Sequence, residues 1–148
     1  MNNSYYDNPH HLIPGRVSGY SKGPEGIINA EYISMTQPYA AGALASSVDD
    51  LALWDSALYS DKLLSQKVLK QAFIPHLLSD GSSTSYGFGW EISDYEGHQF
   101  IEHGGGIHGF VSYAIRIPEI KAFVVVLSNN QEFIPEEVAF KIAALLIC

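Results

Sequence analysis

The chain has 148 residues, 47% of them hydrophobic, which is enough for one globular domain or for part of a larger one. A formal charge of −8 and the lack of any basic run argue against nucleic acid and against an anionic membrane surface as partners. The longest apolar stretch is too short and too interrupted for a membrane span, and the one cysteine, Cys148, excludes an internal disulfide.

Residues 1–45 are rich in glycine, proline, asparagine and tyrosine and show no sustained period. This composition predicts loops with short irregular elements. So long a segment without regular structure is unusual inside a compact domain. We therefore expect it to lie over a surface that other residues provide. No apolar core of a signal peptide follows Met1.

Residues 46–76 are predicted to be helical. Ser47 stands three residues before Asp50, which is the spacing of a helix cap. An apolar stripe at helical spacing follows, made of Leu51, Trp54 and Leu58. A second helix is predicted to begin near Ser65 and to end before Pro75.

Residues 86–148 change to a period of two, which predicts strands. The expected strands cover residues 86–93, 98–102, 111–117 and 122–127. Their short connections favour an antiparallel arrangement, and the last is apolar on both faces, as a strand in the middle of a sheet would be.

A carboxyl-terminal helix is predicted from Pro135 to Ile147, with Glu136 and Glu137 near the positive end of its dipole. Because this helix is apolar nearly all round, we expect it to be covered on more than one side. The fold class is therefore α+β: an antiparallel sheet of about four strands, with helices before it and a last helix packed on it.

The run from Glu102 to Phe110 contains three consecutive glycines after a histidine. Backbone N–H groups with no side chains in the way are suitable donors for a developing oxyanion. Glycine also lets a substrate approach a strand edge closely. The candidate site residues are His103, Gly104, Gly105, Gly106 and His108. The alternative is that the glycines form a tight strand connection and that His103 is a hydrogen-bonded edge residue.

Two other motif matches lack the context that their chemistry needs. Gly104, Gly106 and Gly109 have the spacing of a dinucleotide-binding loop, which works only where a helix follows, and a strand is predicted here. The segment 19–23 (GYSKG) matches the nucleophile elbow of α/β-hydrolases, but no buried parallel strand precedes it. The histidines lack a third ligand at metal-binding spacing. We therefore predict no cofactor and no metal.

Five segments, in this order, resemble the carboxyl-terminal portion of the serine β-lactamase-like hydrolases. They are residues 14–20 (PGRVSGY), 41–54 (AGALASSVDDLALW), 86–90 (YGFGW), the run around His103, and 122–130 (AFVVVLSNN). This family includes class C β-lactamases, D,D-peptidases, D-aminopeptidases and related esterases. The resemblance covers nearly the whole chain and implies that it is the carboxyl-terminal part, residues 1–148, of one β-lactamase-like domain.

The resemblance also implies roles for the glycine run. His103, Gly104 and Gly105 lie where family members have Lys-Thr-Gly or His-x-Gly on the strand beside the active site. Gly106 matches the residue whose N–H forms half of the oxyanion hole. His103 and Gly106 are therefore the expected catalytic residues, and Gly104, Gly105 and His108 the expected substrate-binding residues.

The Ser-x-x-Lys motif, which carries the family's nucleophile, does not occur in this chain, since no serine has a lysine three residues later. The segment 6–8 (YDN) fits the family's Tyr-x-Asn motif by letters, but we interpret it as a chance match in a loop. We therefore expect the chain alone to be inactive and the missing amino-terminal segment of the same protein to be its partner.

The expected function is that of a serine hydrolase cleaving amide or ester bonds through an acyl-serine intermediate. Since histidine is mostly neutral at pH 7, His103 is a weaker counter-ion for a β-lactam carboxylate than lysine, which favours esters or D-amino-acid peptides. The alternative is a non-catalytic binding module. The resemblance implies that the strand over residues 122–127 pairs with a strand from the amino-terminal part, so we expect its edge to be open here and a homo-oligomer to form through it. The compartment is unknown, with a family preference for the periplasm or the extracellular space.

Overall fold

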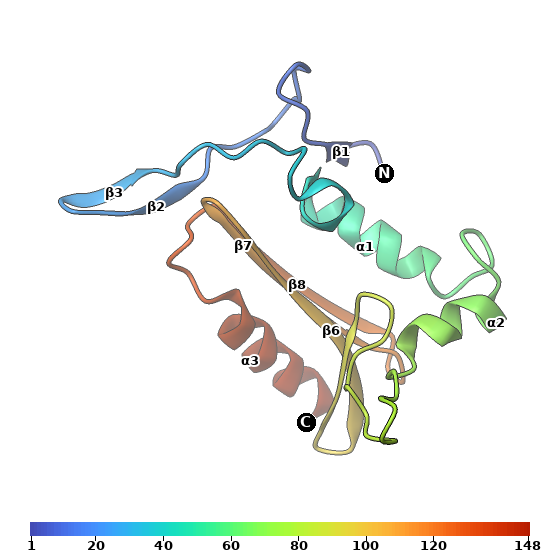
Figure 1. Ribbon diagram of the computed structural model, residues 1–148. Helices are drawn as coiled ribbons and strands as arrows, with labels where there is room; N and C mark the ends of the chain where they lie inside the picture. The colour runs from blue at the N-terminus through green and yellow to red at the C-terminus, as the bar shows by residue number, and fades with distance from the viewer.

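The computed structural model describes residues 1–148 and has three layers (Figure 1). A four-stranded antiparallel sheet lies in the middle, the carboxyl-terminal helix α3 (Pro135–Ile147) packs on one face, and helix α1 (Val48–Ala57) lies toward the other. This confirms the α+β class and the covering helix. No helix is long and apolar enough to cross a membrane.

The sheet has the strand order β5–β6–β7–β8. Its strands are β5 (Glu91–Tyr95), β6 (His98–Ile107), β7 (Phe110–Ile117) and β8 (Ala122–Ser128). Turns of two residues join β5 to β6 and β6 to β7, and the turn residues Glu96, Gly97 and Gly109 have positive φ. Glycine adopts this conformation without steric cost, so the glycines allow the tight turns.

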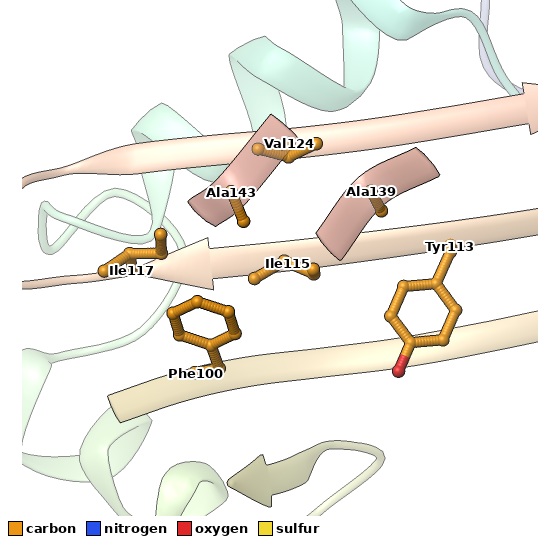
Figure 2. Packing of buried hydrophobic residues seen from close by; sticks show 7 residues of the cluster. All are labelled: Phe100, Tyr113, Ile115, Ile117, Val124, Ala139 and Ala143. Carbon is orange, nitrogen blue, oxygen red and sulfur yellow. The ribbon is translucent and has the colours of Figure 1, made fainter. Parts of the chain in front are cut away.

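The core fills the space between the sheet and α3. Its fully buried members include Phe100 on β6, Ile115 and Ile117 on β7, and Ala143 on α3 (Figure 2). The small alanines of α3 let the helix approach the sheet, while the larger side chains come from the strands. The outer side of α3 is not covered: Leu145 is 77% exposed. The expectation that α3 is covered on more than one side is therefore wrong for this chain.

Helix α1 is tied to both the sheet and the amino terminus. The Ser47 hydroxyl accepts from the Asp50 N–H, which confirms the predicted cap. Asp55 of α1 forms a buried ion pair with Arg116 of β7, which places α1 over the face of the sheet opposite α3. Short helices follow, α2 (Gln66–Leu69) and η2 (Lys70–Phe73), where the second helix was predicted.

The first 45 residues contain only short elements, as expected. These are β1 (Tyr5–Tyr6), the hairpin of β2 (Tyr20–Gly23) and β3 (Gly26–Asn29), η1 (Tyr39–Ala41) and β4 (Leu44–Ala45). The β2–β3 hairpin projects away from the main sheet (Figure 1). Its strands were not predicted, because residues 20–29 show no clear alternation of apolar and polar side chains.

Three strand predictions need correction. Residues 86–90 form no strand: the Gly87 N–H donates to the Trp90 carbonyl, so the segment folds back before β5 begins. Strand β6 does not end at Glu102 but continues through all three glycines. Strand β5 continues to Tyr95, two residues beyond the predicted end. Strand β8 lies at an edge of the sheet, where an open edge was expected.

Candidate active site

Strand β6 sends alternate side chains to opposite faces of the sheet. Phe100 and Glu102 lie on the α3 face, opposite Ile117 and Ile115 of β7. His103 lies on the other face, toward α1. Neighbouring residues of β6 therefore lie in different environments: Glu102 lies on the α3 face and His103 on the face toward α1.

The two halves of β6 differ in their pairing. Residues 98–102 pair with β5, and the last two of them, Ile101 and Glu102, also pair with β7. From His103 to Ile107 the strand pairs only with β7, because β5 begins opposite Glu102. The side of β6 that faces β5 is therefore an open edge over residues 103–107, which we call the glycine edge.

The β5–β6 turn shows which backbone groups point to the glycine edge. Tyr95 and His98 flank a two-residue turn, so this pair exchanges its N–H and C=O groups. Hydrogen-bonded and non-bonded pairs alternate along an antiparallel ladder. Counting in steps of two from His98 brings the N–H and C=O of Gly104 and Gly106 to the same side, where β5 has ended.

The β6–β7 turn gives the same result independently. Ile107 and Phe110 flank the second two-residue turn and form a bonded pair, so His103, Gly105 and Ile107 direct their backbone groups toward β7. Outside the ladders, no backbone hydrogen bond reaches Gly104 or Gly106. The Gly106 N–H is thus free to donate to a bound group.

His103 uses both ring nitrogens. Its Nε2 lies 2.7 Å from the hydroxyl of Tyr86, and its Nδ1 contacts the Gly104 carbonyl. A carbonyl can only accept, so Nδ1 carries the proton and donates. In the neutral ring, Nε2 then accepts from the Tyr86 O–H. His103 is half-buried and takes part in no ion pair.

The glycines of the run are constrained differently. A Cβ at Gly105 would lie 2.6 Å from the Ser112 hydroxyl, and one at Gly104 would lie 3.2 Å from the Tyr113 ring. A Cβ at Gly106 would meet nothing within 4 Å. Close approach within the sheet therefore explains the first two glycines, whereas Gly106 faces open space.

A surface concavity of about 500 Å³ adjoins Gly106. Segment 33–42 forms one wall, and the end of β6 with its turn forms the other; the lining residues are Ile33, Gln37, Pro38, Ala41, Gly42, Gly106, Ile107 and His108. His108 lies in the turn, and its Nδ1 donates to the Glu31 carbonyl over 3.2 Å. His108 and Gly106 thus border one concavity that contains no carboxylate and no lysine or arginine.

Glu102 lies outside this site. It is 4% exposed, accepts from the Ser93 hydroxyl at 2.6 Å, and its second carboxylate oxygen has no partner. Burial raises the pKa of Glu102 above its usual range. Burial and the nearby Glu102 carboxylate also raise the pKa of Tyr113, which lies on the same face of the sheet.

The dinucleotide-loop and nucleophile-elbow matches lack the required helix or strand in the structure as well. Gly109 is followed by strand β7 and not by a helix, and Ser21 lies in the β2–β3 hairpin. No group of three or more histidine, cysteine, aspartate or glutamate residues is arranged to hold a metal ion.

The predicted strand ended at Glu102, and only the family resemblance placed His103, Gly104 and Gly105 on a strand. Sequence reasoning missed Tyr86, the partner of the histidine. Tyr86 was assigned to a strand because of its alternation with glycines. The signal that pointed to the site was the 86–90 segment itself, one of the pieces that carried the family resemblance.

Comparison with known proteins identifies the family. Residues 1–147 match the Beta-lactamase family, so the chain belongs to it. Penicillin-binding protein 4* of Bacillus subtilis (strain 168) is 34% identical over 135 residues, covering 82% of this chain and 30% of that protein. D-aminopeptidase of Gluconobacter oxydans (strain 621H) is 26% identical over 87 residues, covering 59% of this chain and 17% of that protein.

Solved structures agree with the fold. The octameric penicillin-binding protein homologue from Pyrococcus abyssi superposes with a TM-score of 0.83 at 25% identity, over 99% of this chain and 34% of that one. D-amino acid amidase from Ochrobactrum anthropi SV3 superposes with a TM-score of 0.69 at 24% identity, over 88% of this chain and 39% of that one. The chain spans less than a third of the length of the two relatives named above.

Proposed function

We propose that this chain is the carboxyl-terminal part of a serine hydrolase that cleaves amide or ester bonds through an acyl-serine intermediate. The observation that carries the proposal is the free N–H of Gly106 on an open strand edge, beside a concavity. Because no serine in the chain has a lysine three residues later, the nucleophile belongs to another segment.

The proposed role of the glycine edge follows from its backbone groups. When a serine attacks the acyl carbon, the carbonyl oxygen becomes anionic and needs N–H donors aimed at it. Gly106 supplies one such donor, and loss of a single donor typically raises the barrier by about 3–4 kcal/mol. The C=O groups of Gly104 and Gly106 face the same side, so an extended substrate can pair with the edge as an added strand.

The substrate class that we favour lacks a carboxylate at the His103 position. A carboxylate needs a cation or several donors, and both nitrogens of His103 are engaged within the chain. Esters or amides of D-amino acids fit this requirement. The resemblance to a protein named D-aminopeptidase supports this choice.

A binding module without catalysis is the second candidate. Two apolar or unpaired surfaces favour it: the outer edge of β8 has no partner strand, and Leu145 and Leu146 of α3 are exposed. Open strand edges and apolar patches recruit other polypeptides. A relative is described as octameric. We propose that the chain assembles with copies of itself through these surfaces, or pairs with an amino-terminal segment.

A serine-directed fluorophosphonate probe separates the two candidates. We expect no labelling of the chain alone, and labelling when the chain is joined to an amino-terminal segment that carries Ser-x-x-Lys. Labelling of the chain alone would identify an internal nucleophile and contradict the proposal. If the joined protein is folded by circular dichroism and stays unlabelled, the binding module is the better account.

A further inference from the structure

Tyr86 forms a hydrogen-bonded pair with His103, and the proposed function so far gives Tyr86 no role of its own. The hydroxyl of Tyr86 lies 2.7 Å from Nε2 of His103, and the ring centroids are 5.7 Å apart at an interplanar angle of 70°. An edge-on approach of this kind directs the phenol oxygen at the ring nitrogen. It is the one hydrogen bond that the Tyr86 hydroxyl makes.

The backbone around Tyr86 is held firmly. The His76 N–H donates to the Tyr86 carbonyl over 2.8 Å, and Tyr86 bridges to Glu91 at the start of β5. At the next residue, Gly87, a Cβ would lie 2.1 Å from the Ala72 carbonyl oxygen. Only glycine fits there, so this close approach fixes the direction from which Tyr86 reaches β6.

Counting donors and acceptors shows which group the pair offers to a ligand. The Gly104 carbonyl requires a proton on Nδ1, so the neutral ring accepts at Nε2. The Tyr86 proton is therefore committed to His103, and what remains on the phenol oxygen is acceptor capacity. Tyr86 is not buried: 38% of the residue is exposed.

We propose that Tyr86 is a specificity-determining residue: it donates to Nε2 of His103 and accepts a hydrogen bond from an ammonium or amide N–H of the substrate. This inference deepens the proposed function and rests on it for the identity of the substrate. It favours amides and esters with a free α-ammonium group. The Tyr86 hydroxyl bonds only to His103, so no lysine or arginine side chain already donates to the phenol oxygen.

The first test reads the tautomer directly in the intact chain. Two-bond ¹H–¹⁵N correlations of the imidazole are expected to give the pattern of a protonated Nδ1 in the wild type. In Tyr86→Phe, the unprotonated Nε2 loses its donor, so its ¹⁵N resonance moves. The matched control is Tyr95→Phe, which removes a hydroxyl without a hydrogen bond from the opposite face of the same sheet and leaves the His103 pattern unchanged.

The second test uses two amides that differ only at the α carbon. D-alaninamide carries an ammonium there, and propanamide carries a hydrogen. We expect D-alaninamide to bind the wild type about tenfold more tightly, as one charge-assisted hydrogen bond allows. Tyr86→Phe removes this preference and Tyr95→Phe keeps it. Chemical shifts of the Tyr86 and His103 side chains and of the Gly106 amide report the binding.

The outcomes separate the inference from the function on which it rests. A proton on Nε2 of His103 in the wild type, or an equal preference for D-alaninamide in Tyr86→Phe, overturns the role of Tyr86. A Gly106 amide that no ligand moves counts against the docking edge, and hence against the proposed function. In that case the change of the Nε2 ¹⁵N resonance between wild type and Tyr86→Phe still decides whether Tyr86 bonds to His103.

Discussion

The two halves of strand β6 are residues 98–102 and residues 103–107, and they differ in that β5 pairs only with the first half. Residues 98–102 pair with β5, Ile101 and Glu102 also pair with β7, and Phe100 and Ile101 are 0% and 2% exposed. Residues 103–107 keep only β7 and are mostly glycine. Where the strand loses β5, its backbone groups stop stabilising the sheet and become available to a ligand. A single strand thus serves the core in one half and the candidate site in the other.

The largest expected effect lies in the first half. Phe100→Ala should lower the free energy of unfolding by about 3–5 kcal/mol, because it leaves a cavity between the sheet and α3. Gly106→Ala, in the second half, should change it by less than about 1 kcal/mol, since its Cβ meets nothing within 4 Å. Urea unfolding measures both. Equal losses would show that the two halves do not differ as described.

The next effect is on catalysis. In a protein that joins this chain to a Ser-x-x-Lys segment, Gly106→Pro removes the free N–H and should lower kcat by a factor of about 10²–10³. Proline is tolerated at an edge where the N–H has no ladder partner, so stability should change little. Gly106→Ala keeps the N–H and serves as the control. A Gly106→Pro variant with unchanged kcat would remove Gly106 from the mechanism.

A smaller effect concerns the buried carboxyl of the first half. Because the pKa of Glu102 is raised in the folded state, that state binds more protons than the unfolded chain at pH values above the usual carboxyl range. Wild-type stability should therefore fall as the pH rises from about 4 toward neutrality. Glu102→Gln should be more stable than wild type at pH 7, and this advantage should shrink as the pH falls toward about 4. A constant difference between the two would contradict this.

Asp50, at the start of α1, should show the opposite sign. Burial acts to raise its pKa, but the Ser4 hydroxyl and the N–H groups of Asn3 and Asn2 outweigh it and lower the pKa. The stabilisation is complete above the usual aspartate range and is lost as the pH falls through the lowered value. We expect Asp50→Asn to weaken this acid dependence slightly, as measured by thermal melting across pH. A steeper acid loss in the variant would contradict the assignment.

Local signals predicted those parts of the fold in which side chains near in sequence decide the structure. The Ser47 cap, the start of α3 at Pro135 and the apolar alternation of β7 belong to this group. Each depends on contacts within a few residues or on burial against one continuous face. The apolar composition of β8 on both faces is that of an internal strand, so its open edge was expected only through the family resemblance.

The glycine run shows why sequence reasoning did not give the site in full. Glycine has a low strand propensity, so the predicted strand ended at Glu102, and only pairing with Ser112 and its neighbours on β7 makes residues 104–106 a strand. Tyr86 alternates with glycine like a strand residue, but the contact of Gly87 with Ala72 turns the segment back. Both outcomes depend on residues distant in sequence.

Amide hydrogen exchange along residues 103–107 tests the central claim most directly, because it reads each N–H of the glycine edge separately. We predict fast exchange at Gly104 and Gly106, whose N–H groups face the open edge, and slow exchange at Gly105 and Ile107, whose N–H groups donate to β7. Equal protection of all four amides would contradict an open glycine edge and with it the proposed docking of a substrate.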